Sequence, residues 1–133
     1  MIHNREIRNA FYQNIGKLFY TIAMADKQVH PNEIKKLKED VRKYWLSVDE
    51  IEDEFGTDAA LQIEIVFDWL LLEEKKGQHY YQEFLDFYKE HPVFFTLDIK
   101  KIIWKTADDI ASSYAGKNKS ELIILAKLKQ LLT

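Results

Sequence analysis

Residues 22–33 read IAMADKQVHPNE, a pattern typical of the turn between two helices. Pro31 suits the first position of a new helix, where its missing N–H is no loss, and Glu33 falls at the third position, where its carboxylate can bond orphan backbone N–H groups. A fainter copy, IASSYAGKNKSE, occupies residues 110–121. In both copies an Ile-Ala pair precedes a Glu that lies ten residues after the Ala. The repeat predicts two related helix–loop–helix halves.

Outside these turns, apolar residues recur at three- and four-residue steps, which is the period of an α-helix. Only four Gly and two Pro interrupt the 133 residues. The periodic segments lie at about 4–25, 31–45, 48–55, 58–76, 78–91, 96–115 and 118–132. We predict an all-α fold: a single domain over residues 1–133 that forms a compact bundle of about seven helices, one of them short.

The segment at 58–76 is apolar on nearly all sides, so we expect it to be the central helix around which the others pack. Gly77 is expected to end it. Its polar residues Glu64 and Asp68 lie four positions apart on one face, and we interpret them as its exposed stripe.

Composition and charge exclude several classes of protein. The absence of Cys excludes disulfides, zinc–thiolate sites and thiol nucleophiles. The longest apolar runs fall short of the roughly 18 residues of a membrane span, so we expect a soluble cytoplasmic protein. A net charge of −3 gives no reason to expect a nucleic-acid partner. Residues 100–133 carry seven Lys against three acids, so +4, which leaves −7 for residues 1–99; we interpret the basic end as solvated helix ends.

The stretch LFYTIAMADKQVHPNEIKKL at residues 18–37 resembles the signature of the TerB-like domain family, named for tellurite-resistance protein B. The same fold is shared by the N-terminal region of a membrane-anchored DnaJ-type co-chaperone. The residues that match the family pattern in register are Ala25, Asp26, Val29, Pro31 and Glu33. The resemblance implies an all-α domain of about seven helices in two related halves. It also implies a cation site made by acidic residues of the two turns, and no particular reaction.

Two positions depart from the family pattern. Lys27 stands where the family has Gly. If that position needs a positive φ, the Lys is strained, and its ammonium would repel a cation. Tyr114 stands where the second turn would carry an Asp. Asp108 and Asp109 lie about one and a half turns earlier, too far along the helix to substitute directly.

Of the acidic positions that the family implies, Asp26, Glu33 and Glu121 remain. These residues are our candidate metal ligands, for Ca²⁺ or Mg²⁺, because both ions take oxygen ligands. The alternative is that both Glu side chains cap their helices and that Asp26 helps to close the first helix. No EF-hand loop pattern is present.

Two further hypotheses concern the function as a whole. The chain is 14% aromatic. Five of its aromatic residues are more than one face of a helix can bury: Tyr80, Tyr81, Phe87, Phe94 and Phe95. These side chains either fill the core or form a docking patch for a protein partner or a second copy of the chain. We find no nucleophile motif, phosphate-binding loop or paired His ligands, and we assign no catalytic residue. A carboxylate-based hydrolase therefore ranks below a non-enzymatic binding or stress-associated protein.

Overall fold

The computed structural model of the protein describes residues 5–25, 27–48, 58–113 and 118–133. This part of the chain is all-α, as predicted, and contains six α-helices. They are α1 (Arg5–Ala23), α2 (Pro31–Asp40), α3 (Gln62–Leu72), α4 (Gly77–Glu90), α5 (Leu97–Ser112) and α6 (Lys119–Leu132). The predicted short helix at 48–55 falls almost wholly outside the described residues, so six helices stand where about seven were expected.

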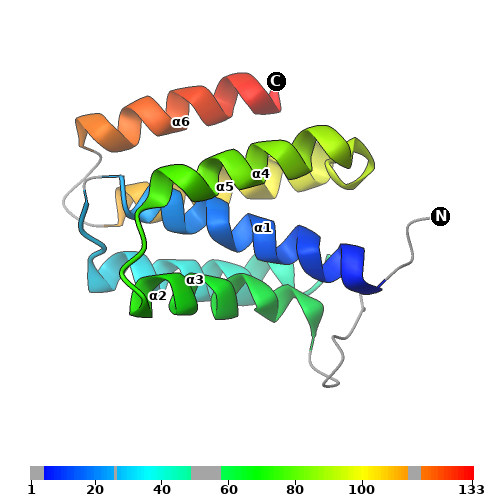
Figure 1. Cartoon of the computed structure of the whole chain (residues 1–133), viewed down its shortest axis with the longest axis horizontal. Coiled ribbons are helices and arrows are strands. Elements are labelled where there is room, and N and C mark those ends of the chain that lie inside the picture. Colours follow the sequence, from blue (N-terminus) through cyan, green and yellow to red (C-terminus); the bar gives the residue numbers. More distant parts are fainter. Residues whose placement is uncertain (1–4, 26, 49–57, 114–117) are drawn as a thin grey trace.

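Helix α1 is the centre of the molecule. Eleven of its 19 residues are buried, and it packs against α3, α4, α5 and α6. In Figure 1, α1 runs through the middle of the view, with α3 below it and α4 and α6 above it. The prediction that the segment at 58–76 is the central helix is therefore wrong.

Helix α3 uses only one face for the core. Its buried residues are Ile63, Glu64, Phe67 and Leu70, whereas three of its other apolar side chains are exposed. The helix is apolar on nearly all sides, but α1 occupies the centre, so only the face of α3 that is turned toward the core can be buried. Glu64 is consequently buried, contrary to the expectation that it belongs to an exposed stripe, while Asp68 is exposed as expected.

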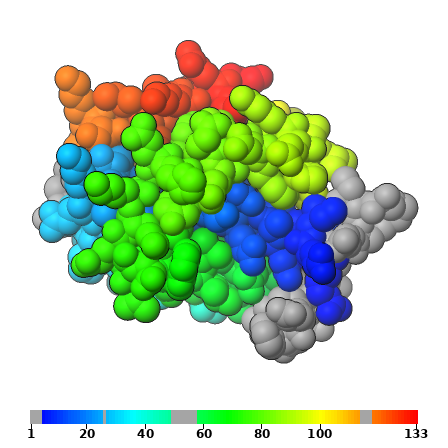
Figure 2. Space-filling model, viewed as in Figure 1, coloured from blue at the N-terminus to red at the C-terminus, as the bar shows by residue number. Residues whose placement is uncertain are grey.

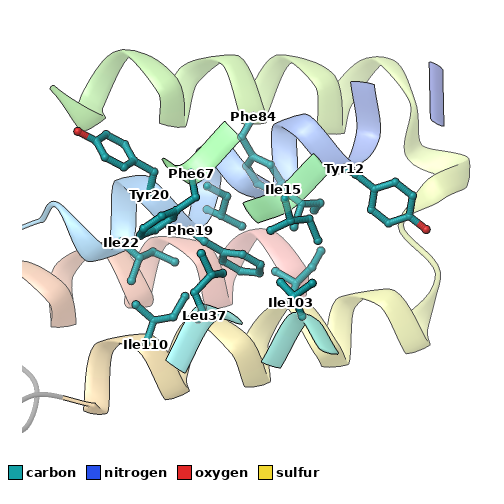
Figure 3. Packing of buried hydrophobic residues seen from close by; sticks show 14 of the residues in the cluster. Tyr12, Ile15, Phe19, Tyr20, Ile22, Leu37, Phe67, Phe84, Ile103 and Ile110 are labelled. Atoms are coloured by element: carbon teal, nitrogen blue, oxygen red, sulfur yellow. The ribbon is translucent and has the colours of Figure 1, made fainter. Parts of the chain in front are cut away.

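The core forms where the inner faces of the helices meet around α1. In Figure 3, Ile15, Phe19 and Ile22 of α1 lie among side chains from four other helices. Those side chains, all fully buried, are Leu37 of α2, Phe67 of α3, Phe84 of α4, and Ile103 and Ile110 of α5. They belong to one hydrophobic cluster that spans the bundle.

Most of the aromatic surplus fills this core. Phe87 and Phe95 are buried, and Tyr80, Tyr81 and Phe94 are half-buried and pack against the cluster. The ring of Phe87 lies 6.0 Å from that of Phe94 and 6.3 Å from that of Phe95. Of the two roles that the sequence left open for these residues, core packing is the one the structure supports.

Helix α3 ends earlier than predicted, and its end is built without glycine. Glu74 has a positive φ of 52°. The Glu74 N–H donates to the Leu71 carbonyl at 3.1 Å, and the Lys75 N–H donates to the Leu70 carbonyl at 3.1 Å. This is the Schellman pattern that closes many helices. Gly77, expected to end this helix, instead begins α4.

The turn after α1 also carries a non-glycine residue in the left-handed region. Lys27 has a φ of 68°, so the condition set in the sequence analysis is met: this position does need a positive φ. An L-residue in this region is destabilised by contact between its Cβ and the following carbonyl.

The predicted helix at 31–45 is α-helical only as far as Asp40. It continues as a π-helical turn, Val41–Trp45, in which the Leu46 N–H donates to the Val41 carbonyl at 3.1 Å. The wider turn places the Trp45 indole against α5, where its Nε1–H donates to Thr106 Oγ1 at 3.0 Å.

Among the described residues, no helix combines the length and apolar content that a bilayer crossing requires.

Gly16 sets the separation of α1 and α3. A Cβ built at this position would lie 2.7 Å from the Ile63 carbonyl oxygen and 3.2 Å from the Val66 Cβ. We expect Gly16→Ala to lower the free energy of unfolding by about 1–3 kcal/mol, although Ala is the better helix former. Urea denaturation measures this change. Gly77→Ala, whose Cβ would approach nothing closer than 3.2 Å, is the control and should lose less. A gain in stability from Gly16→Ala would contradict the close approach.

The positive φ of Glu74 and of Lys27 makes both sites candidates for stabilisation. We expect Glu74→Gly and Lys27→Gly each to raise the free energy of unfolding by about 0.5–1 kcal/mol, because relief of strain exceeds the backbone entropy of glycine. Thermal denaturation provides the measurement. The matched control is Glu73→Gly, where φ is −83° and glycine should destabilise by a similar amount.

Candidate functional site

The two turns that opened the sequence analysis lie at the same end of the molecule. In Figure 1 the C-terminal end of α1 and the N-terminal end of α2 lie at the left, as do the C-terminal end of α5 and the N-terminal end of α6. Each pair of helices is antiparallel in this view. The described parts of the two halves thus bring the turns to one end, which a shared cation site would require.

Glu33, the first predicted ligand, caps its own helix. It is 1% exposed, and its Oε1 accepts a hydrogen bond from the His30 N–H at 2.8 Å. His30 is the N-cap residue and Pro31 begins α2, as the sequence predicts. A buried carboxylate with this local partner satisfies an orphan backbone group of the helix start.

Glu121, the second predicted ligand, forms a complete capping box. Its Oε1 accepts from the Asn118 N–H at 3.0 Å, and its own N–H donates to Asn118 Oδ1 at 2.9 Å. The side chain is 4% exposed. Asp26, the third predicted ligand, and Tyr114 lie outside the described residues. Across the described ranges, no three His, Asp or Glu side chains gather closely enough to hold a metal ion. The cation site therefore stays a prediction, and helix capping accounts for the burial of both glutamates.

An acidic pair that the sequence analysis did not single out lies between α2 and α5. Asp40, on α2, is 1% exposed. Its carboxyl shares a hydrogen bond with that of Asp109 on α5. Lys36 Nζ lies 3.9 Å from Asp40 Oδ1, and Lys105 Nζ lies 3.0 Å from Asp109 Oδ1. The signal available in the sequence is the position of Asp40, which follows Leu37 by three residues and so shares its buried helix face.

The surroundings shift the pKa values of the two carboxyl groups in opposite directions. Burial, the hydrogen bond with Asp109 and the charge of Asp109 together raise the pKa of Asp40 to about 7, against the opposing effect of Lys36 and Lys105. Burial alone would raise the pKa of Asp109, but hydrogen bonds with Asp40 and Lys105 outweigh it and hold that pKa below its ordinary value. Below about pH 7 the pair therefore holds one proton, and it resides on Asp40.

A shallow groove of about 390 Å³ opens beside this pair. It is lined by Asn32, Lys35, Lys36, Glu39, Asp109, Ser112 and Ser113. Asp109 reaches the groove with 13% of its side chain exposed, whereas Asp40 lies behind it. The protonated carboxyl is thus shielded from any molecule in the groove. Of the two carboxyls, only Asp109 lines the groove.

The exposed face of α3 is the other unusual feature. Ile65, Trp69 and Leu72 are 50%, 52% and 79% exposed, and their spacing places them along one stripe of the helix. On the α2 side of the helix, Asp68 Oδ2 lies 3.2 Å from Lys38 Nζ. Glu64 Oε1 lies 3.4 Å from an Arg42 guanidinium nitrogen. We call Ile65, Trp69 and Leu72 the α3 stripe. In Figure 2 the segment that carries it forms the lower part of the face shown.

Comparison with protein families, with curated proteins and with solved structures gives no match to this chain. The resemblance to TerB-like domains therefore rests on the residues quoted in the sequence analysis.

The capping role of Glu121 can be separated from a ligand role by substitution. We expect Asn118→Ala to lower the free energy of unfolding by about 1 kcal/mol, since it removes the side-chain acceptor of the helix start. Glu121→Gln should lose much less, because Gln also serves in a capping box. Thermal denaturation with and without Ca²⁺ or Mg²⁺ supplies the contrast. A cation-dependent rise in Tm that Glu121→Gln removes would show that the residue is a ligand.

Proposed function

We propose that this chain is a TerB-like, non-enzymatic binding domain that docks through the α3 stripe, and that its occupant is a second copy of the chain. The observation that carries the proposal is the exposure of three large apolar side chains in a row on a helix whose other face is buried. Single exposed apolar residues are common, but a contiguous row on a protein surface marks an interaction site more often than scattered ones do.

The spacing of the stripe supports a helix as the docking element. Residues at i, i+4 and i+7 form the seam by which one amphipathic helix packs on another. Ile65 and Leu72 lie at equal distances in sequence from the midpoint between Asp68 and Trp69. In an antiparallel pair of α3 helices, Ile65 of one copy would therefore face Leu72 of the other. A twofold arrangement of this kind is the commonest in soluble homo-oligomers.

The charges around the stripe favour self-association over a partner of one charge sign. The carboxylates beside it are matched by cations: Asp68 by Lys38 and Glu64 by Arg42. In the following turn, residues 73–76 add two Glu and two Lys, which balance each other. A surface with balanced charge can face its own copy without like-charge repulsion, whereas a strongly acidic or basic partner would gain little from it.

The proposal is tested by the oligomeric state of the full chain over a range of concentrations. We expect size-exclusion chromatography with light scattering to show a monomer–dimer equilibrium, and Trp69 emission to shift to the blue as the dimer forms. Ile65→Glu should raise the dimer Kd at least tenfold, which is about 1.4 kcal/mol, because it places a charge in the seam. The control is Ile123→Glu on α6, since Ile65 and Ile123 are both 50% exposed.

Two results would contradict this function. One is a wild-type chain that remains monomeric at the highest soluble concentration. The other is a dimer that Ile123→Glu weakens as much as Ile65→Glu does, since the interface would then not be specific to α3.

A further inference from the structure

Two buried polar links join α5 to the segment formed by α2 and the π turn. The first is the hydrogen bond from Trp45 Nε1–H to Thr106 Oγ1, in which both side chains are fully buried. The second is the hydrogen bond shared by the Asp40 and Asp109 carboxyls, one helical turn further along α5. Because hydrogen bonds are directional, these two buried links constrain how the elements align.

The Asp40–Asp109 link requires a proton. Two carboxylates share a hydrogen bond only when one of them is protonated, because ionised carboxylates are acceptors alone. Asp40 Oδ2 is buried, and no N–H or O–H donor of the described residues reaches it. A proton on Asp40 gives that carboxyl the donor that its surroundings lack. Its loss would leave two negative charges in contact inside the protein.

The charged groups that face this pair come from both helices and from the π turn. On α2, Lys36 lies 3.9 Å from Asp40 Oδ1 and also pairs with Glu39 at 3.8 Å. On α5, Lys105 pairs with Asp109 at 3.0 Å. On the π turn, Tyr44 interacts electrostatically with Lys105 and contributes to the raised pKa of that lysine. Both lysines favour the ionised form of Asp40, but burial and the contact with Asp109 outweigh them.

The π turn gives the proton a mechanical consequence. It begins at Val41, directly after Asp40, and it ends at Trp45, whose indole makes the other buried link to α5. A π turn is rare and occurs mostly as a single irregular turn inside an α-helix. Displacement of Asp40 would be passed to Trp45 through this one short segment.

We infer that the Asp40–Asp109 pair is a proton-linked latch: one shared proton holds α2 and the π turn against α5, and its loss loosens that contact. The latch would leave the folded chain intact but would change how tightly the α2–π segment is held. It is independent of the α3 stripe, so either proposal can fail without the other.

The direction of the pH dependence follows from the two carboxyls. The pKa of Asp40 is raised from 3.8 to about 7, so between about pH 4 and pH 7 the folded chain holds a proton that the unfolded chain has released. The contribution of Asp40 to the free energy of unfolding therefore falls as pH rises through that window, and it is lost above pH 7. The pKa of Asp109 is lowered, so its contribution is lost only as pH falls below its ordinary range.

The experiment compares the wild-type chain with Asp40→Asn by urea denaturation from pH 4 to pH 8. The carboxamide keeps the shape of the protonated carboxyl, donates to Asp109 and cannot ionise. We expect the folding equilibrium constant of Asp40→Asn, relative to wild type, to rise at least tenfold across this range, with a ceiling of about 10³-fold set by the pKa difference. Glu39→Gln is the matched control, since it removes an exposed carboxylate one residue away and should leave the pH profile of wild type unchanged.

Two further measurements use the wild-type chain, so the test does not depend on how well the variant folds. Carbon-13 NMR of the side-chain carboxyls should show one Asp that titrates above pH 6. Hydrogen exchange, corrected for intrinsic rates, should show lower protection of the amides of residues 37–46 at pH 8 than at pH 5. A carboxyl titration of Asp40 below pH 5, parallel profiles for wild type and Asp40→Asn, or unchanged protection of residues 37–46 would each overturn the latch.

Discussion

The burial of α1 is the constraint from which the rest of this structure follows. Most of its surface is covered by other helices, and Gly16 permits α3 to approach its backbone at a distance that no side chain would allow. Once α1 occupies the centre, each surrounding helix can turn only one face inward. The apolar side chains on the outer face of α3 therefore remain exposed. The aromatic side chains of α4 and of the following 3₁₀ turn, Pro92–Phe94, pack against the hydrophobic cluster. A single central helix therefore decides which apolar residues become core and which become surface.

This bundle buries several acidic side chains and exposes several large apolar ones, whereas most proteins bury apolar residues and expose charged ones. Three acidic side chains of α2 and α3 are buried: Glu33 at a helix start, Asp40 against α5, and Glu64 beside Arg42. Burial raises the pKa of Glu64, and the charges of Arg42 and Lys38 oppose that rise. Glu33 is satisfied by the start of its own helix, whereas Asp40 Oδ2 and Glu64 Oε2 are buried with no hydrogen-bond donor from the described residues. The exposed apolar stripe is close to Glu64 on the same helix. Asp109 alone of the acidic pair lines the groove, whereas the whole α3 stripe lies at the surface.

Local rules of sequence predicted much of the fold but less of its arrangement. Helix starts were predicted correctly at His30, Thr96 and Asn118, because a capping residue and its partner lie within three positions of each other. The central helix was predicted wrongly, because an apolar composition does not reveal which face other helices will cover. The end of α3 was missed for a related reason: glycine usually marks a helix end, and here Glu74 adopts the required conformation in its place. Glu33 and Glu121, the candidate ligands, have the capping role that the sequence offered as the alternative. The pairing of Asp40 with Asp109 was not foreseen because it joins positions far apart in the chain. Sequence periodicity identifies faces, and only the assembled bundle shows which faces meet.

Helix α6 buries only a small part of its surface. It lies along one edge of the bundle in Figure 1, packs mainly on α5 and α1, and buries only Glu121, Leu125 and Leu128. A hydrogen bond from the Tyr88 hydroxyl to the Leu131 carbonyl holds its last turn to α4. Elements with few buried contacts open first in local unfolding, and they do so far more often than the whole domain unfolds. Transient release of this helix would uncover the sides of α1 and α5 beneath it.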